Sequence, residues 1–236
     1  MLVTLFTHNS LPMSLDTIIE MQQVSVYQKQ MLVLSDVTLS IERGEFCYLI
    51  GRTGSGKSSL MKVLYADLPM VDGFARVAGF DLMGIKDSQI PFLRRKIGIV
   101  FQDFQLLTDR SVKENLTFVM KATGWRDKIA MEERMNEVLE KVGLQTKSFK
   151  MPHQLSGGEQ QRVVIARSLI NDPDIILADE PTGNLDPETS EGIMELLFDI
   201  SKAGRAVLMA THDYQLFEKF PARIFQCEGG RVIDKG

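Results

Sequence analysis

Residues 51–58 read GRTGSGKS and match the phosphate-binding pattern G-x-x-x-x-G-K-[ST] at every fixed position. The three glycines allow consecutive backbone N–H groups to point inward at phosphate oxygens. Lys57 adds a positive charge for the β- and γ-phosphates, and the Ser58 hydroxyl can bind Mg²⁺. A glycine-rich structural turn is the alternative. The β-rich run EFCYLI before the loop and the helical pattern from Lys57 to about Tyr65 favour a nucleotide site.

A second chemical group follows the apolar run IILADE at residues 175–180. The run predicts a buried strand, and Asp179 at its end can hold Mg²⁺ through water. Glu180 is the next residue, where a carboxylate can accept a proton from an attacking water. Adjacent acids can instead cap the next helix or lie in solvent, but the upstream loop favours catalysis.

Other polar residues also end apolar β runs. His212 follows AVLMAT and can reach a γ-phosphate, while the amide of Gln102 follows IGIVF and can contact Mg²⁺ and water. Tyr27 stands 30 residues before Lys57, where it stacks on a purine base or packs in the core. Guanine is normally read by an Asn-Lys-x-Asp motif, which this chain lacks, so the expected nucleotide is ATP.

The segment LSGGEQQRVVIAR at residues 155–167 predicts a helix whose N-terminus is covered by almost no side chains. Bare backbone N–H groups at a helix start attract an anion. Ser156, Gly157 and Gly158 therefore make a second phosphate cradle, and one chain of this size carries two of them.

The bulk composition describes a globular chain. It has 236 residues, a formal net charge of −4 and 44% hydrophobic residues, so it lacks the basic surface that wraps nucleic acid. Cys47 and Cys227 form no motif and are expected to be buried free thiols. No apolar run is long enough for a bilayer, and no secretion signal is present. Residues 1–14 are expected to be a disordered extension, or an over-long start with Met13 as the initiator.

Residues 15–236 are expected to form one domain. Alternating patterns at 17–50 predict paired strands, and β signals follow at 74–79 and 97–103. A helical insert is expected over about 103–168, where four apolar residues at i, i+3, i+4 and i+7 predict an amphipathic face. Buried strands are predicted at 174–179 and 206–211, with a helix through Ile193 and Ile200 between them. Gly229-Gly230 predicts a C-terminal hairpin. The amphipathic face consists of Met135, Val138, Leu139 and Val142.

Taken in chain order, these motifs closely resemble those of the ATP-binding cassette ATPases, from about residue 17 to residue 233. The resemblance implies an α/β fold: a P-loop NTPase of ABC type, with a RecA-like core sheet and flanking helices, an N-terminal antiparallel β subdomain and a helical signature subdomain. It also implies that two copies pack head to tail, and that each copy's second cradle closes on the γ-phosphate held by the other. Two ATP molecules then join a homodimer.

The resemblance assigns roles by position. Glu180 is the catalytic base, His212 the switch, Tyr27 the adenine stack and Asp186 in GNLD a cross-subunit contact. Lys57 and Gln102 assist catalysis, and Ser58, Gln102 and Asp179 serve Mg²⁺. The phosphate loop comprises Gly51, Arg52, Thr53, Gly54, Ser55, Gly56, Lys57, Ser58 and Ser59, and the signature comprises Ser156, Gly157, Gly158 and Glu159.

Finer similarities concern the partner. PTGNLD (181–186) resembles the branch that pairs with FtsX/MacB-type membrane proteins, including lipoprotein-release ATPases. Within that branch, the stretch IPFLRRKIGIVFQDFQLLTDRSVKEN (90–115) is similar to ATPases that serve FtsX-like integral membrane proteins in cell division and control peptidoglycan hydrolysis. The resemblance implies a cytoplasmic protein on the inner face of the plasma membrane, which contacts its membrane partner around residues 102–107. Other division proteins are further expected partners. The alternatives are a lipoprotein-release or MacB-type exporter, a cassette ATPase acting on DNA or ribosomes, and a nucleotide-sensing scaffold.

Overall fold

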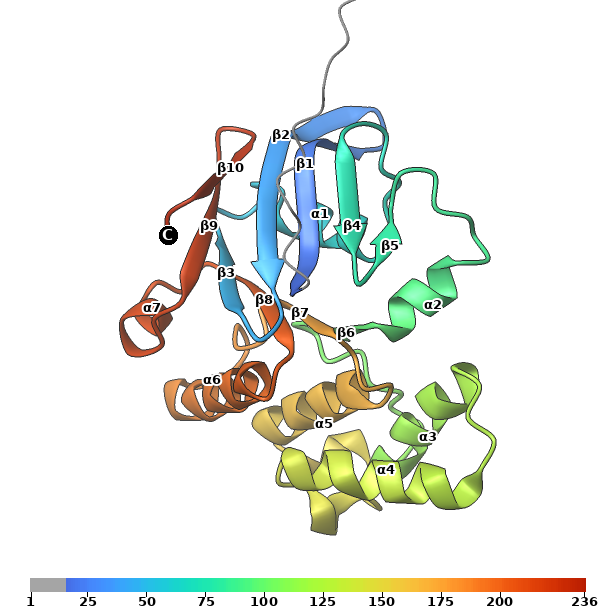
Figure 1. Cartoon of the computed structure of the whole chain (residues 1–236). Helices are drawn as coiled ribbons and strands as arrows, with labels where there is room; N and C mark the ends of the chain where they lie inside the picture. The colour runs from blue at the N-terminus through green and yellow to red at the C-terminus, as the bar shows by residue number, and fades with distance from the viewer. Residues whose placement is uncertain (1–15) are drawn as a thin grey trace, which may run out of the picture.

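The computed structural model describes residues 16–236, which form two β-sheets and a group of helices (Figure 1). The first sheet is antiparallel with strand order β2-β1-β4-β5. Its strands are β1 (Thr17–Gln28), β2 (Met31–Glu42), β4 (Phe74–Val77) and β5 (Phe80–Asp81). The predicted pairing of the first two strands is therefore confirmed. The predictions for residues 1–14 lie outside the described residues.

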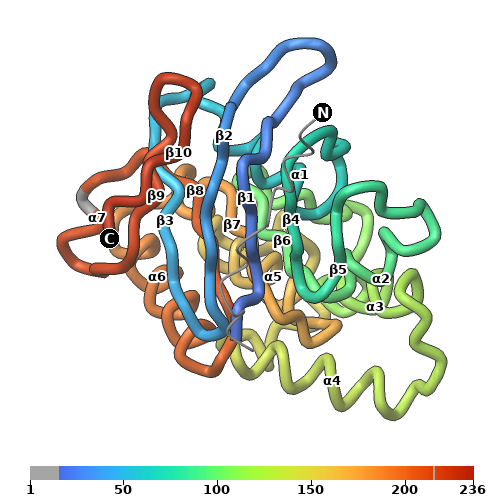
Figure 2. Tube along the Cα trace, turned by 45° about the horizontal axis from the view of Figure 1, so that its top comes forward, coloured from blue at the N-terminus to red at the C-terminus, as the bar shows by residue number. Residues whose placement is uncertain are grey.

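The second sheet has six strands in the order β10-β9-β3-β8-β7-β6. Every neighbouring pair is parallel except β9 and β10, which form the predicted C-terminal hairpin around Gly229-Gly230. This hairpin lies beside β2, where the Ser35 amide donates to the Gly230 carbonyl at 2.8 Å (Figure 2). The strands are β3 (Phe46–Ile50), β6 (Ile97–Val100), β7 (Ile175–Asp179), β8 (Ala206–Thr211), β9 (Arg223–Glu228) and β10 (Arg231–Asp234).

The central strands are apolar on both faces because each face of the six-stranded sheet is covered. In β3, Phe46, Tyr48 and Ile50 join a core shared with the helices. The alternate residues Cys47 and Leu49 join a second core, which is shared with the antiparallel sheet and with α1 (Lys57–Leu64). Side chains of a strand point to opposite faces in turn, so a doubly covered strand reads as a continuous apolar run.

Helices α5 (Gly157–Leu169) and α6 (Pro187–Lys202) cover the face of the six-stranded sheet opposite the antiparallel sheet (Figure 1). Helices α3 (Val112–Ala122) and α4 (Lys128–Lys141) pack against α5. Helix α5 contacts β6 as well as the helices on either side of it, so it connects the sheet to the helical layer. The predicted amphipathic face is confirmed, since Met135 is 4% and Val142 is 0% exposed. The short 3₁₀ turns η1 (Gln145–Lys147) and η2 (Pro152–Gln154) lie between α4 and α5.

Three short elements were not predicted from the sequence: β5, α2 (Ile90–Arg95) and α7 (Gln215–Lys219). Helix α2 spans 6 residues and places proline in its first turn, so only Leu93 of that helix is buried. One buried residue leaves no periodic pattern to recognise. Within residues 16–236, no helix combines the length and the apolar character needed to cross a bilayer.

Candidate functional site

The loop at residues 51–58, hereafter the P-loop, connects the carboxyl end of β3 to the start of α1. Gly56 is the N-cap of α1 with φ 103°, in the left-handed region that glycine adopts without strain. A Cβ on Gly56 would lie 2.9 Å from side-chain atoms of Val33 and Leu34 in β2. A Cβ on Gly51 (φ 151°) would lie 2.6 Å from the Cys227 carbonyl oxygen. Both glycines are therefore required for the loop to pass between β2 and β9.

Lys57 is buried, with 7% of its surface exposed. Its Nζ donates to the Gly51 carbonyl at 2.7 Å and to the Arg52 carbonyl at 3.4 Å, and lies 4.0 Å from Glu180 Oε1. A buried ammonium held by carbonyls is costly unless charge partners are present. Here its nearest carboxylate is Glu180, so Lys57 and Glu180 belong to one site.

Asp179 ends β7, and Ser58 lies in the first turn of α1. Burial raises the pKa of the Asp179 carboxyl, and a hydrogen bond from the Ser58 hydroxyl opposes that shift. The neighbouring Glu180 carboxylate raises the same pKa further. This close pair supplies one hydroxyl and one carboxylate oxygen, which are the hard donors that Mg²⁺ prefers.

Glu180 adopts φ 49°, which is unusual for a residue with a side chain. Its amide donates to the Ala210 carbonyl of β8 at 2.9 Å, and this bond fixes the backbone beyond the strand end. Glu180 Oε1 lies 2.8 Å from His212 Nδ1. The Glu180 side chain is 14% exposed and the His212 side chain 61% exposed, so the imidazole forms the open side of this pair.

Gln102 follows the end of β6, so it lies at the same edge of the sheet as Asp179 and His212. Its carbonyl accepts from Asn184 Nδ2 at 3.1 Å, and a Cβ on Gly183 would lie 2.9 Å from its Nε2. Ligands bind outside the carboxyl ends of parallel strands in open α/β sheets. Four such ends converge here, those of β3, β6, β7 and β8.

These groups line one cleft of about 730 Å³, hereafter the nucleotide cleft. Tyr27 is absent from its lining, so the assignment of Tyr27 to adenine stays a prediction. Gly51, Arg52 and Ser55 are also absent from the lining. The lining also includes residues that were not predicted for the nucleotide site, among them Gln28 and Met31, and Met31 is 65% exposed. The lining comprises Gln28, Met31, Val33, Thr53, Gly54, Gly56, Lys57, Ser58, Ser59, Phe101, Gln102, Asp103, Gln105, Asp179, Glu180 and His212.

Residues 156–159, hereafter the signature segment, begin α5. Ser156 is the N-cap: its Oγ accepts from the Glu159 amide at 3.2 Å, while the Ser156 amide donates to Glu159 Oε2 at 2.9 Å. Gly158 is packed so closely that a Cβ would lie 2.3 Å from Thr189 Cγ2. Asp186 caps α6 and accepts from the Thr189 hydroxyl at 2.6 Å. The signature segment and Asp186 are therefore joined through Thr189.

The signature segment is separate from the nucleotide cleft, because none of its residues and no part of α6 lines that cleft. Ser156 is nevertheless exposed, so its helix start is open to the outside. The two segments that the sequence predicts to bind phosphate therefore lie at different places on the chain.

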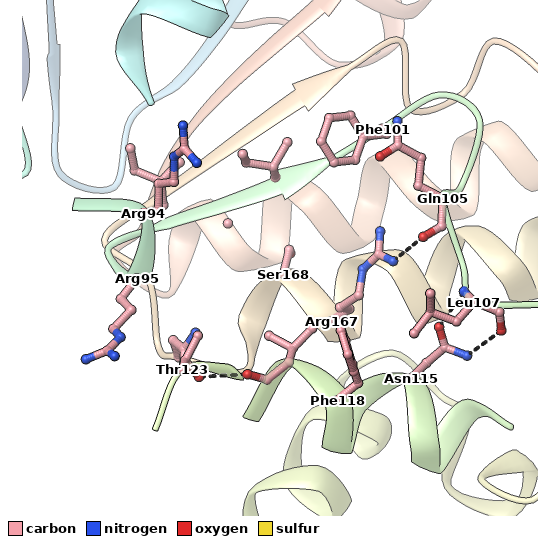
Figure 3. Close-up of a pocket in the computed structure, with 15 residues that line it drawn as sticks. Arg94, Arg95, Phe101, Gln105, Leu107, Asn115, Phe118, Thr123, Arg167 and Ser168 are labelled. Atoms are coloured by element: carbon pink, nitrogen blue, oxygen red, sulfur yellow. Dashed lines mark hydrogen bonds between the residues drawn. The ribbon is translucent and has the colours of Figure 1, made fainter. Parts of the chain in front are cut away.

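A second hollow of about 360 Å³, hereafter the groove, lies between α2, β6, α3 and α5 (Figure 3). Phe101 and Gln105 line both the groove and the nucleotide cleft. Arg167 donates to the Phe104 carbonyl at 3.0 Å and also to the Gln105 carbonyl, as Figure 3 shows for Gln105. The lining comprises Arg94, Arg95, Ile97, Gly98, Ile99, Phe101, Gln105, Leu107, Asn115, Phe118, Val119, Thr123, Arg167, Ser168 and Asn171.

Comparisons with known proteins agree with this geometry. The family model described as "ABC transporter" matches residues 34–183. The chain is 43% identical over 218 residues to the Cell division ATP-binding protein FtsE of Streptococcus pneumoniae, covering 92% of this chain and 94% of that protein. A bacterial ABC transporter cassette solved as a dimer superposes with a TM-score of 0.79 at 34% identity, over 91% of this chain and 96% of that one.

The same cassette was also solved as a dimer in a post-hydrolysis state with ADP and Pi; this chain is 32% identical to it, with a TM-score of 0.79 and coverage of 92% and 97%. The expected fold class and the expected ATPase activity are thereby confirmed. This chain belongs to the ATP-binding cassette family and is an ATPase.

Proposed function

We propose that the chain works as a head-to-tail homodimer that closes on two ATP molecules and passes the motion to a membrane protein in cell division. The observation that carries the proposal is the separation of the two phosphate cradles. Lys57 lines the nucleotide cleft, whereas Ser156 does not line it and is exposed at the start of α5. A second copy related by a two-fold axis can bring its signature segment to the first copy's cleft.

Within the cleft, Glu180 is the proposed general base. Its carboxylate lies 2.8 Å from the His212 imidazole and 4.0 Å from the Lys57 ammonium, so it is oriented from two sides. Lys57 and the P-loop amides bind the β- and γ-phosphates. Thr53, Gly54 and residues 56–59 line the cleft around the proposed phosphate position. We infer that His212 contacts the γ-phosphate or holds the Glu180 side chain, whose Oε1 lies 2.8 Å from His212 Nδ1.

Mg²⁺ is the expected cofactor, and the donor set fits it. The Ser58 hydroxyl and the Asp179 carboxylate are hydrogen-bonded to each other, and Gln102 adds an amide oxygen at the edge of the cleft. Among the described residues no cluster of three or more His, Cys, Asp or Glu side chains is present. A sparse set of oxygens suits Mg²⁺, which keeps several waters and substrate phosphates in its coordination sphere. When bound, it offsets phosphate charge.

The FtsE protein of Streptococcus pneumoniae is named for cell division, and its similarity over nearly the whole chain supports the same role here. We propose an FtsX-like integral membrane protein as the partner and the inner face of the plasma membrane as the location. Control of peptidoglycan hydrolysis is the proposed output. Since Phe101 and Gln105 line both hollows, a segment seated in the groove would touch the wall of the nucleotide cleft.

The groove has the chemistry of a helical docking site for that partner. Ile99, Phe118 and Val119 give it an apolar floor and rim, and Phe118 is 46% exposed. Three arginines and no acidic residue are among its described lining residues. The guanidinium of Arg95 lies over the Phe92 ring, which is itself 56% exposed. An amphipathic segment with an acidic end would complement this surface.

The dimer is tested with Glu180→Gln, which keeps the shape of the side chain but removes the base. We expect normal ATP binding, at least about 100-fold slower phosphate release and a stable ATP-dependent dimer, because closure persists when hydrolysis stops. Phosphate release and sedimentation with and without Mg-ATP measure these. A variant that hydrolyses ATP normally, or stays monomeric with ATP even when the membrane partner is supplied, would contradict the proposal.

The membrane partner is tested by capture from detergent-solubilised membranes with the Glu180→Gln chain and ATP. We expect an FtsX-like protein, and Phe118→Asp should lose it because a charge enters the apolar rim of the groove. Phe149→Asp is the matched control, since Phe149 is 71% exposed and does not line the groove. Recovery of an exporter or lipoprotein-release subunit instead would assign the chain to those systems.

A further inference from the structure

Glu159 places a negative charge at the open end of α5. It is the third residue of the helix, and its Oε2 accepts from the Ser156 amide at 2.9 Å. In the proposed dimer this helix start closes on a γ-phosphate, so the inference below rests on the proposed function. A carboxylate in the first turn opposes the attraction that the helix N-terminus exerts on an anion. The signature segment therefore carries a negative charge that opposes its proposed binding of a phosphate.

Lys147 compensates that charge. It ends η1, and its Nζ pairs with Glu159 Oε1, the oxygen not used by the Ser156 amide. The Lys147 side chain is 38% exposed and the Glu159 side chain 24% exposed, so the pair lies at the rim of the helix start. The ammonium and the backbone hydrogen bond together lower the pKa of the Glu159 carboxyl, which stays ionised and needs a counter-charge.

We propose that Lys147 is a positioning residue for ATP-driven closure: it neutralises Glu159 so that the signature segment can approach the phosphate held by the other subunit. Lys147 and Glu159 are 12 residues apart, so no sequence motif predicts their pairing. Lys147 need not touch the nucleotide, because its effect passes through Glu159.

The alternative role of Lys147, to hold η1 in place, is already served by the backbone. The Lys147 amide donates to the Leu144 carbonyl and the Lys150 amide donates to the Lys147 carbonyl, each at 3.0 Å. The start of α3 is fixed to the same turn, since the Lys113 amide donates to the Ser148 carbonyl at 2.8 Å. Removing the Lys147 side chain leaves all of these bonds intact.

The experiment measures ATP-dependent dimerisation in the Glu180→Gln background, by sedimentation at several protein concentrations with Mg-ATP. Lys147→Ala should raise the dimer dissociation constant by about fivefold or more, as expected for one uncompensated charge at each of two phosphate sites in water. Binding of ATP to the monomer, followed with a fluorescent ATP analogue, should change less than about twofold.

The decisive variant adds Glu159→Gln to Lys147→Ala. Glutamine still accepts a hydrogen bond from the Ser156 amide, so the cap is preserved while the charge is removed. We expect the double variant to dimerise as well as Glu180→Gln alone. Continued weak dimerisation in the double variant would show that Lys147 does not act through Glu159. Equal dimerisation of Lys147→Ala and its parent would also overturn the inference.

Lys141→Ala is the matched control, because Lys141 pairs with Glu137 at 2.7 Å on α4 and does not contact the signature segment. It should leave the dimer constant unchanged. Failure of the Glu180→Gln parent itself to dimerise would reject the proposed function, whereas a normal parent with an unaffected Lys147→Ala would reject only this inference.

Discussion

At the residue scale, the P-loop and the signature segment require glycine for different physical reasons. Gly56 is needed for its left-handed backbone and for its approach to β2. Gly158 has no unusual φ; only the space for a side chain is missing, because Thr189 Cγ2 occupies it. A sequence motif shows both simply as glycine, and the structure separates a conformational requirement from a steric one.

Gly158→Ala tests that steric contact. The added methyl group would lie 2.3 Å from Thr189 Cγ2, and overpacking of this kind typically lowers the free energy of unfolding by about 1–3 kcal/mol. Urea unfolding measures the loss. Shifting α5 away from α6 would also misplace the signature segment. The ATPase rate should therefore fall by more than the loss of folded protein explains.

A second substitution makes the test specific. Thr189→Ser removes Cγ2 but keeps the hydroxyl that donates to Asp186. Gly158→Ala combined with Thr189→Ser should therefore recover most of the lost stability. A double variant as unstable as Gly158→Ala alone would show that the strain comes from another contact.

At the element scale, α4 is supported by a small ionic cluster. Arg134 and Lys141 both pair with Glu137, and together their hydrogen bonds lower the pKa of Glu137 to about 2. Arg134 also donates to the Ile170 carbonyl at 3.1 Å and to the Leu169 carbonyl, which are the last carbonyls around the end of α5. The cluster thus joins α4 to the C-terminus of α5.

Glu137→Gln should show a pH-dependent effect. A carboxyl whose folded-state pKa is depressed stabilises the protein above its unfolded value of about 4.5 and loses this contribution as pH falls toward about 2. Because the Glu137 side chain is 47% exposed, solvent screening limits the contribution to about 1 kcal/mol or less at neutral pH. Urea unfolding at pH 7, 4.5 and 3 should show the difference between wild type and variant shrinking. A difference that stays constant would contradict the pKa assignment.

The sequence predicted those elements whose signal is long and continuous. The central strands read as continuous apolar runs because both faces of their sheet are buried. Helix α6 has a regular apolar periodicity because one of its faces is buried. Helix α2 escaped prediction because a short helix with one buried residue has no periodicity. Residue propensity and hydrophobic pattern depend on residues that are close in sequence. Elements stabilised mainly by tertiary contacts are therefore only weakly predicted from the sequence.

The candidate site divides in the same way. The P-loop and the Asp179-Glu180 pair were predicted because their chemistry is contiguous in sequence. The lining of the cleft by Met31 and the pairing of Lys147 with Glu159 were not predicted, because they arise when distant segments fold together. No residue type at these positions distinguishes them from ordinary surface residues before the fold is known.

At the scale of the whole molecule, the separation of the cradles predicts an effect of Ser156→Arg. The isolated chain should bind ATP normally, since Ser156 does not line the nucleotide cleft. Closure should fail because a long charged side chain blocks the start of α5, and the ATPase rate should fall to background. Glu133→Arg is the control, as Glu133 is exposed on α4. Normal turnover by Ser156→Arg would refute the trans arrangement.

The position of Lys57 and Ser156 on different parts of one chain also has a genetic consequence. In a cell with equal amounts of normal and Ser156→Arg chains, random pairing leaves only roughly one quarter of the two-fold dimers with two normal members. In the proposed dimer the altered allele should therefore act dominantly, because each Ser156→Arg chain blocks a site that it shares with a normal chain. An allele that only prevents folding would be recessive, since an unfolded chain does not form dimers with normal chains.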